Sequence, residues 1–168
     1  MSASVVVVLL FAFLYTASAD LLGTEEVAFS AGITSSQTLH NGERVAFDSL
    51  YTNIGSAYDT NTGIFNCPFS GIYLFQVHTM ASQDKSSWLE LYHNSYYIFS
   101  LYGHSNNEYG AASNSVILRL SKGDQVYVRS VNSKYGASTD IYGQVDEIYS
   151  TFSGYLLSPV YEDIINIG

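Results

Sequence analysis

Hydrophobic and polar residues alternate over short stretches of this chain, which is the pattern of β-strands and not of helices. In residues 71–81, Tyr73 and Phe75 mark one apolar face, while Ile72 and Leu74 mark a second. Because both faces are largely apolar, we expect this strand to be covered on two sides. Helical periodicity is weak along the whole chain.

Similar short segments recur along the chain, with polar turns between them. The other predicted strands are residues 27–31, 45–50, 64–67, 88–92, 96–101, 116–120, 126–129 and 151–157. The turn signals include Asn41-Gly42, Asn61-Thr62-Gly63 and Asn94-Ser95. Lys122-Gly123-Asp124 predicts a hairpin between segments 116–120 and 126–129. The pattern predicts an all-β fold, an antiparallel sandwich or jelly roll of about ten strands.

The beginning of the chain has the features of a secretory signal peptide. Residues 5–15 are all apolar, and this run is shorter than the roughly 20 residues needed to cross a bilayer. Ala17 and Ala19 follow in A-x-A spacing, which predicts cleavage after Ala19, with an uncleaved membrane anchor as the alternative. We therefore expect a signal peptide (1–19), a short lead-in (20–26), one globular domain (27–160) and a C-terminal tail (161–168). The mature protein is expected to be secreted and extracellular.

Composition narrows the classes of partner. The 168 residues carry a formal charge of −9, because the sequence contains 15 Asp and Glu but only 6 Lys and Arg. A negative chain repels phosphate backbones, which argues against a nucleic-acid-binding role. Cys67 is the only cysteine, so no intrachain disulfide can form. Its place between Phe65 and Phe69 predicts a buried thiol and not a bridge between subunits.

Motifs give little support for catalysis or for a metal site. The chain has no G-x-S-x-G, H-E-x-x-H, P-loop or G-x-G-x-x-G sequence. The histidines do not fall at ligand spacing; they are His40, His78, His93 and His104. The segment 59–63 begins like a calcium loop, but its twelfth position is Ser70 in place of a Glu, so we interpret it as a turn. We expect a protein that is not an enzyme and has no metal site of this kind.

One segment has the composition of a binding surface. Residues 92–109 combine many tyrosines with Ser, Asn and Gly, the balance that antibody loops use for contact area and adaptable hydrogen bonding. The alternative is that these tyrosines fill strand faces or a subunit interface, since strands favour Tyr in any case. The candidate ligand-binding residues are Tyr102, His104, Asn106, Asn107, Glu108 and Tyr109.

The ordered spacing of aromatic residues and glycines over about residues 27–159 resembles the C1q globular domain, the trimeric jelly roll shared with the tumour necrosis factor ligands. The residues that carry the resemblance are Phe47, Asn53, Tyr58, Phe65, Gly71, Tyr73, Phe75, Phe152 and Gly154. At one position, Val77, the family usually has an aromatic residue. The resemblance implies a homotrimer whose function is recognition and not chemistry.

The resemblance also implies classes of partner and cofactor. A trimeric, lectin-like head that binds microbial surface glycans or proteins in innate immunity is the first expectation. A structural component of an extracellular matrix, egg coat or shell, or a receptor-binding signalling ligand, is the alternative. Several family members bind calcium through an Asp and a Gln at positions that here hold Gly110 and Ala111, which have no side-chain oxygen. No cofactor is therefore expected, although residues 106–108 lie close enough in sequence to leave calcium as an alternative.

Overall fold

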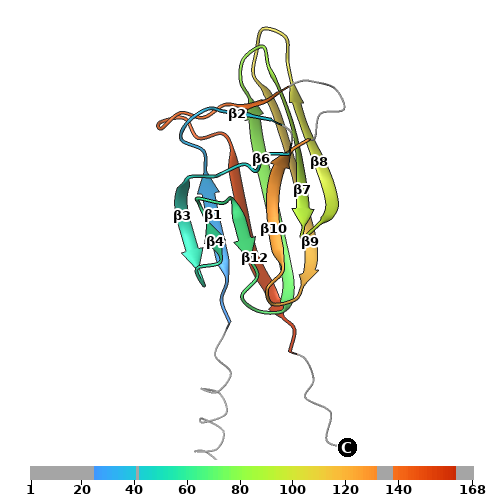
Figure 1. The fold of residues 1–168 in the computed structure, drawn as a ribbon. Helices are drawn as coiled ribbons and strands as arrows, with labels where there is room; N and C mark the ends of the chain where they lie inside the picture. The colour runs from blue at the N-terminus through green and yellow to red at the C-terminus, as the bar shows by residue number, and fades with distance from the viewer. Residues whose placement is uncertain (1–24, 41, 132–137, 162–168) are drawn as a thin grey trace, which may run out of the picture.

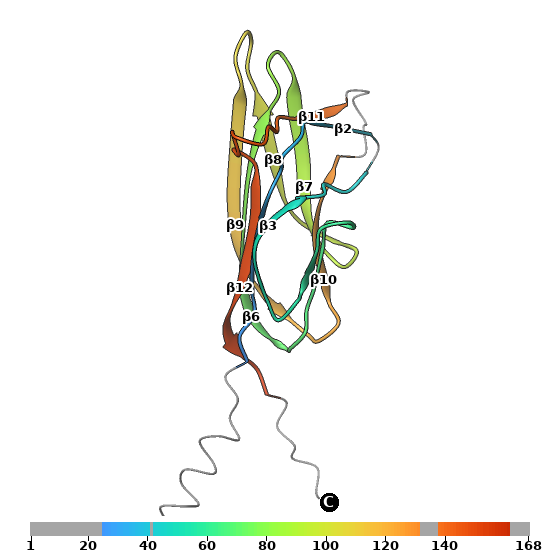
Figure 2. The same cartoon turned by 90° about the vertical axis from the view of Figure 1, so that its left-hand side faces the viewer.

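The computed structural model describes residues 25–40, 42–131 and 138–161, and this part of the chain forms two antiparallel sheets packed face to face (Figures 1 and 2). None of these residues lies in a helix, so no membrane-spanning helix is found among them. The expected all-β sandwich is confirmed. The predicted signal peptide (1–19), most of the lead-in and residues 162–168 of the tail lie outside the described residues.

Twelve strands make up the two sheets. Their bounds are β1 (Ala28–Gly32), β2 (Gln37–Leu39), β3 (Ser49–Ile54), β4 (Tyr58–Asp59), β5 (Ile64–Asn66), β6 (Gly71–Ala81), β7 (Ser86–His93), β8 (Tyr96–His104), β9 (Gly110–Leu120), β10 (Gln125–Ser130), β11 (Thr139–Ile141) and β12 (Thr151–Pro159). The larger sheet has the order β2-β11-β6-β12-β1-β3, with β9 also paired to β6. The smaller sheet has the order β4-β5-β10-β7-β8. The described chain begins and ends at the same end of the sandwich (Figure 1).

Aromatic rings fill the space between the sheets. Phe29 of β1 stacks on Tyr58 with ring centroids 4.7 Å apart and meets Phe152 edge-on at 4.8 Å. Phe65 of β5 contacts Phe75 of β6 across the sandwich at 5.2 Å. Each buried ring removes a large apolar area from water, so this cluster supplies much of the stability of a domain without disulfides.

The remaining residues of the spacing pattern have local structural reasons. Asn53 closes the turn after β3, because its amide donates to the carbonyl oxygen of Tyr58 at 2.9 Å and its Oδ1 accepts from the Tyr58 N–H at 3.1 Å. A Cβ on Gly154 would lie 2.6 Å from a ring atom of Phe75 and 2.8 Å from one of Phe29. A Cβ on Gly71 would lie 2.8 Å from the carbonyl oxygen of Ser158. Any side chain at either glycine would therefore displace its neighbours.

The prediction of a strand over residues 45–50 is wrong. The strand begins at Ser49, and residues 45–48 form no ladder with a neighbouring strand. Val45 and Phe47 are nevertheless buried, because the Val45 N–H donates to the carbonyl oxygen of Val128 in the smaller sheet while the next residues join the larger sheet. The alternation of apolar residues at positions 45–48 therefore reflects burial of an extended segment that passes from one sheet to the other, and it does not indicate strand pairing.

The predicted hairpin across Lys122-Gly123-Asp124 is also wrong. Both strands and the turn exist, with Gly123 at a φ of 92°. However, β9 pairs with β6 in the larger sheet, whereas β10 pairs with β5 and β7 in the smaller one. The turn carries the chain from one sheet to the other, as a jelly roll requires. The true two-residue hairpin turn is Asn94-Ser95, between β7 and β8.

Candidate interaction surfaces

The outward face of the larger sheet carries an apolar row that crosses five strands. The register places Ile54 beside Ala28, Ala28 beside Tyr155, Tyr155 beside Leu74 and Leu74 beside Ile117. Three of these side chains are exposed in the single chain, and Ile117 is 60% exposed. The expectation that β6 is covered on two sides thus holds for only one side within one chain. An exposed apolar row of this kind marks a surface that another protein covers.

The next row on the same face is polar. Thr52, Ser30, Ser153, Gln76 and Ser115 are neighbours in register across the same five strands. The apolar row is therefore confined to one end of the sandwich, near the start of β1 and the end of β12, where the described chain enters and leaves (Figure 1).

The outward face of the smaller sheet carries what we call the tyrosine surface, formed by Trp88, Tyr92, Tyr97, Tyr102 and Tyr127. Tyr92 stacks on Tyr127 with ring centroids 5.9 Å apart and meets Tyr97 at 6.2 Å. Trp88 meets Tyr102 edge-on at 5.4 Å. The alternate residues of β7 and β10, such as Leu89 and Val126, are fully buried, so the rings lie on the outer side of the sheet. Tyr97 and Tyr102 are exposed there, whereas Tyr92 is only 9% exposed.

Two arginines hold rings of the tyrosine surface. The Arg129 guanidinium lies 3.7 Å from the centroid of Tyr92 and 4.0 Å from a carboxylate oxygen of Glu90. Arg44 lies 5.5 Å from the centroid of Tyr127. The Tyr92 hydroxyl donates to Glu90 at 3.0 Å. These cation–π and hydrogen-bond contacts fix the rings before any ligand arrives, which lowers the entropy cost of binding.

The six candidate ligand residues are distributed over three places. Tyr102 and His104 lie on β8 and are exposed, with rings 6.1 Å apart, so they extend the tyrosine surface. Asn106, Asn107 and Glu108 are exposed in the loop between β8 and β9. That loop is held by the neighbouring one, since the Asn107 N–H donates to Asp84 Oδ1 at 2.6 Å.

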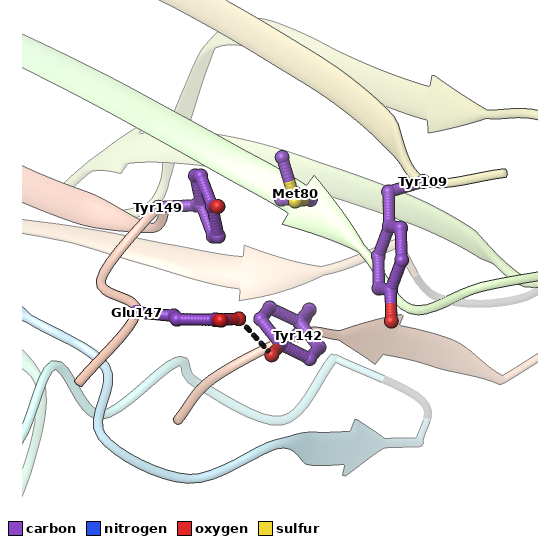
Figure 3. Close-up of a pocket in the computed structure, with 5 residues that line it drawn as sticks. All are labelled: Met80, Tyr109, Tyr142, Glu147 and Tyr149. Atoms are coloured by element: carbon purple, nitrogen blue, oxygen red, sulfur yellow. Dashed lines mark hydrogen bonds between the residues drawn. The ribbon is translucent and has the colours of Figure 1, made fainter. Parts of the chain in front are cut away.

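Tyr109 takes a third place. Its ring meets that of Tyr142 at 5.0 Å, in a hollow that it shares with Met80 of the larger sheet (Figure 3). The sequence reasoning missed Trp88 and Tyr127, which lie on strands outside the tyrosine-rich segment or at its edge. The alternation of aromatic and aliphatic residues in β7 and β10 is a signal that could have identified them.

The titratable residues of the described ranges give no catalytic constellation. No three His, Cys, Asp or Glu side chains among them come close enough to hold a metal ion. His93 lies 3.0 Å from Asp124, and no other histidine of this part forms an ion pair. Cys67 is buried, as predicted, and burial raises the pKa of its thiol, which donates to the carbonyl oxygen of Phe69 at 3.0 Å.

The interpretation of residues 59–63 as a turn is confirmed. Asp59 accepts hydrogen bonds from the Asn61 N–H at 2.8 Å and the Thr62 hydroxyl at 3.0 Å, and Gly63 has a φ of 69°. These hydrogen bonds lower the pKa of the Asp59 carboxyl. At the other candidate calcium position, a Cβ on Gly110 would lie 2.4 Å from the backbone nitrogen of His104. The close approach of β8 and β9 therefore explains why glycine occupies this position.

Comparison with known proteins agrees with this architecture. The C1q domain model matches residues 28–157. The chain is 34% identical over 134 residues to the complement C1q tumor necrosis factor-related protein 3 of Homo sapiens, which covers 79% of this chain and 51% of that protein. It is 36% identical over 135 residues to Caprin-2 of Danio rerio, covering 78% of this chain and 14% of the relative. The chain thus spans about half, or less, of the length of these relatives.

Solved structures show the same fold. The globular domain of zebrafish complement 1qA has a TM-score of 0.66 at 20% identity, covering 81% of this chain and 100% of that one. The Eiger TNF of S. frugiperda has a TM-score of 0.62 at 16% identity, covering 82% and 96%. The chain is therefore a member of the C1q domain family, with the jelly-roll fold that this family shares with the tumour necrosis factor ligands.

Proposed function

We propose that this protein is a secreted homotrimer that recognises microbial surface glycans or proteins through its tyrosine surfaces. Members of the C1q and tumour necrosis factor families are generally non-enzymatic modules that bind ligands or receptors. The observation that carries the proposal is the contrast between the two outward faces: a mainly aliphatic apolar row on one sheet and a fixed array of aromatic rings on the other.

The apolar row supports self-association. Ile54, Tyr155 and Ile117 expose aliphatic or aromatic surface that gains most when it is removed from water. A threefold assembly brings one copy of the row from each subunit toward a common axis, and it covers the second side of β6 around Leu74. The polar row of Ser and Thr above it can hydrogen-bond across the same contact.

The tyrosine surface supports ligand binding. It lies on the opposite sheet from the apolar row, so three copies in a trimer point outward. Aromatic rings stack on the apolar faces of sugars or on side chains of a protein ligand, while their hydroxyls hydrogen-bond polar groups. Each copy binds weakly, and simultaneous engagement of repeated surface ligands raises the overall affinity. The negative net charge disfavours strongly anionic polymers.

The deciding experiment measures mass and binding on the same preparation. Sedimentation equilibrium of the secreted protein, with and without a chelator, is expected to give three times the mass of the chain in both conditions. Binding to immobilised bacteria and to arrays of neutral and anionic glycans is expected at micromolar concentrations of the trimer. A single-chain mass at high concentration contradicts the trimer. The absence of any microbial signal, together with binding to matrix proteins or to a cell-surface receptor, would favour the matrix or signalling alternative instead.

A further inference from the structure

A small hollow lies at the end of the larger sheet that is opposite to the apolar row. It has a volume of about 160 Å³ and is lined by Met80, Tyr109, Tyr142, Glu147 and Tyr149. In Figure 3, Tyr149 and Tyr109 stand at opposite sides of the hollow, with Met80 above and Tyr142 and Glu147 below. Met80 belongs to β6, Tyr109 to the loop before β9, and the other three residues to the segment between β11 and β12. On β6, Met80 is six residues from Leu74, which is roughly 20 Å along an extended strand.

The rings are turned toward one another and are not stacked face to face. The Tyr142 ring centroid lies 5.0 Å from that of Tyr109 at an angle of 73°, and 6.0 Å from that of Tyr149 at 46°. Rings at such angles form the walls of a corner. The π-face of an aromatic ring carries partial negative charge, so a corner of rings attracts a cation that enters it.

Hydrogen bonds hold this corner in place. The Tyr142 hydroxyl donates to Glu147 Oε2 at 2.6 Å, and this bond raises the pKa of Tyr142 to about 12. The Tyr142 N–H donates to the carbonyl oxygen of Met80 at 2.8 Å, and the Met80 N–H donates to Ser150 Oγ at 3.1 Å. Three of the lining residues, Met80, Tyr142 and Glu147, are thus tied together by hydrogen bonds, and a ligand finds them already arranged.

The charge and size of the hollow restrict its ligand. Glu147 is the one formally charged residue in the lining, and no Lys or Arg lies there. A hard cation such as calcium needs six to eight oxygen ligands, far more than one carboxylate and a few phenols supply. The hollow is open to solvent on one side, since Tyr109 is 44% and Tyr149 is 51% exposed. A compact cation with an apolar surface can enter it without losing all of its hydration, and a similar volume of about 150 Å³ holds benzene in an enclosed apolar cavity.

We propose that this hollow, which we call the tyrosine cage, binds the trimethylammonium group of a choline compound. The three tyrosines contact the methyl groups by cation–π attraction, and Glu147 compensates the charge. An adjoining hollow of about 290 Å³ shares Met80 and Tyr149 and is lined also by His78 and Ser113, which leaves room for the rest of the ligand. The proposal stands on the cage alone and requires neither the trimer nor the tyrosine surface.

The test compares choline with its neutral analogue 3,3-dimethyl-1-butanol, which has the same shape without the charge. In calorimetry and saturation-transfer NMR on the secreted protein, choline is expected to bind with a Kd on the order of 1 mM, at least about tenfold more tightly than the analogue. Equal affinity for the two compounds, or no binding of choline, overturns the proposal.

Variants locate the site. Tyr142→Ala and Glu147→Gln are each expected to weaken choline binding about tenfold, while Tyr142→Phe keeps the ring and loses less. Tyr96→Ala is the matched control, because Tyr96 is 71% exposed at the far sheet and does not contact the cage. Thermal unfolding of each variant checks that it is folded. If Tyr142→Ala fails to fold, the Glu147→Gln variant tests the site in its place. Unchanged choline binding in Glu147→Gln would contradict binding of choline in the tyrosine cage.

A vesicle experiment distinguishes the source of the group. Vesicles of phosphatidylcholine that capture the protein, with capture reversed by free choline and absent for phosphatidylglycerol, assign the cage to lipid headgroups. Binding of free choline and phosphocholine without vesicle capture assigns it to soluble compounds. If the wild-type protein does not bind choline but has the trimer mass and binds glycans, this proposal fails and the proposed function stands. If choline binds but the trimer mass or glycan binding is absent, the proposed function fails and this proposal stands.

Discussion

The two outward faces of the sandwich expose different kinds of side chain, although both arise from the same alternation along strands. On the larger sheet, Leu74 and Ile117 offer aliphatic groups that form no hydrogen bonds. On the smaller sheet, Tyr97 and Tyr102 expose rings with hydroxyls, and Tyr97 contacts the nearly buried Tyr92. Aliphatic side chains lower the free energy of the protein most when they are permanently removed from water. Tyrosines combine apolar area with a hydroxyl that can also bond to water, which is compatible with reversible binding. The comparison suggests a division of labour between assembly and recognition.

The largest expected effect is loss of the trimer on placing a charge in the apolar row. In Leu74→Asp, assembly would bury three carboxylates close together without partners, which costs several kcal/mol for each. We expect sedimentation equilibrium at micromolar concentration to give the mass of one chain. The variant should still fold, because Leu74 is only half-buried within a single chain.

Tyr96→Asp is the control for this prediction, since it places the same charge on the smaller sheet at a side chain that is already exposed. It is expected to keep the mass of three chains. A trimer that survives Leu74→Asp, or that is lost in Tyr96→Asp, would show that the two faces have been assigned the wrong way round.

A smaller effect is expected at the tyrosine surface. Tyr102→Ala removes an exposed ring that contacts Trp88, and Tyr97→Ala removes one that contacts Tyr92. Tyrosines are enriched among the minority of contact residues whose truncation costs more than about 1 kcal/mol, so the double variant should bind immobilised bacteria at least about tenfold more weakly with the trimer mass unchanged.

Tyr109→Ala sharpens the same comparison, because the Tyr109 ring contacts Tyr142 in the tyrosine cage, whereas the Tyr102 ring contacts Trp88. Bacterial binding through the tyrosine surface should be unaffected by it. If instead Tyr109→Ala weakens that binding as much as Tyr102→Ala does, the segment 102–109 acts as one site.

The smallest expected effect is on the free energy of unfolding, when Asp124 is changed in the turn that joins the two sheets. Burial would raise the pKa of Asp124, but hydrogen bonds from Asn94 and the Ser121 N–H, together with the neighbouring His93, outweigh it and lower the pKa. A lowered carboxyl pKa stabilises the fold above the ordinary value of about 3.9, and this contribution is lost as the pH falls through the lowered value. Asp124→Asn should therefore lower the free energy of unfolding by about 1 kcal/mol at pH 7.

The measurement is chemical denaturation of both proteins at neutral and strongly acidic pH. The difference between them should shrink in acid, because the wild-type carboxyl is then protonated as well. A difference that stays constant with pH would mean that shape, and not charge, explains the effect of the variant.

Much of the core was predictable because β-strands present alternate residues to one face. Tyr73, Phe75 and Val77 are fully buried in β6, as their spacing indicated. The missed strands β2, β4 and β11 contain only two or three residues each, which is too short for alternation to appear. Pairing partners were not predictable either, since β9 and β10 are adjacent in sequence yet lie in different sheets.

The candidate surfaces were predictable only in part. The tyrosine-rich composition of residues 92–109 indicated a candidate surface on β8, but a shift in register between Leu91 and Tyr92 helps decide which rings share a face. The tyrosine cage is assembled from residues 80, 109, 142, 147 and 149. No local pattern links such distant positions, because only the pairing of β6 with its neighbours brings them together.

The sequence by itself determined the class of fold and the family, since alternation, aromatic spacing and turn residues are local properties that survive without a partner. It also determined that no intrachain disulfide holds the core, because Cys67 is the only cysteine of the sequence. The tertiary structure decided which sheet each strand joins and therefore which side chains meet on each outer face. Those choices depend on register between segments far apart in the chain, and the hydrophobic pattern of one segment carries no information about the register of another.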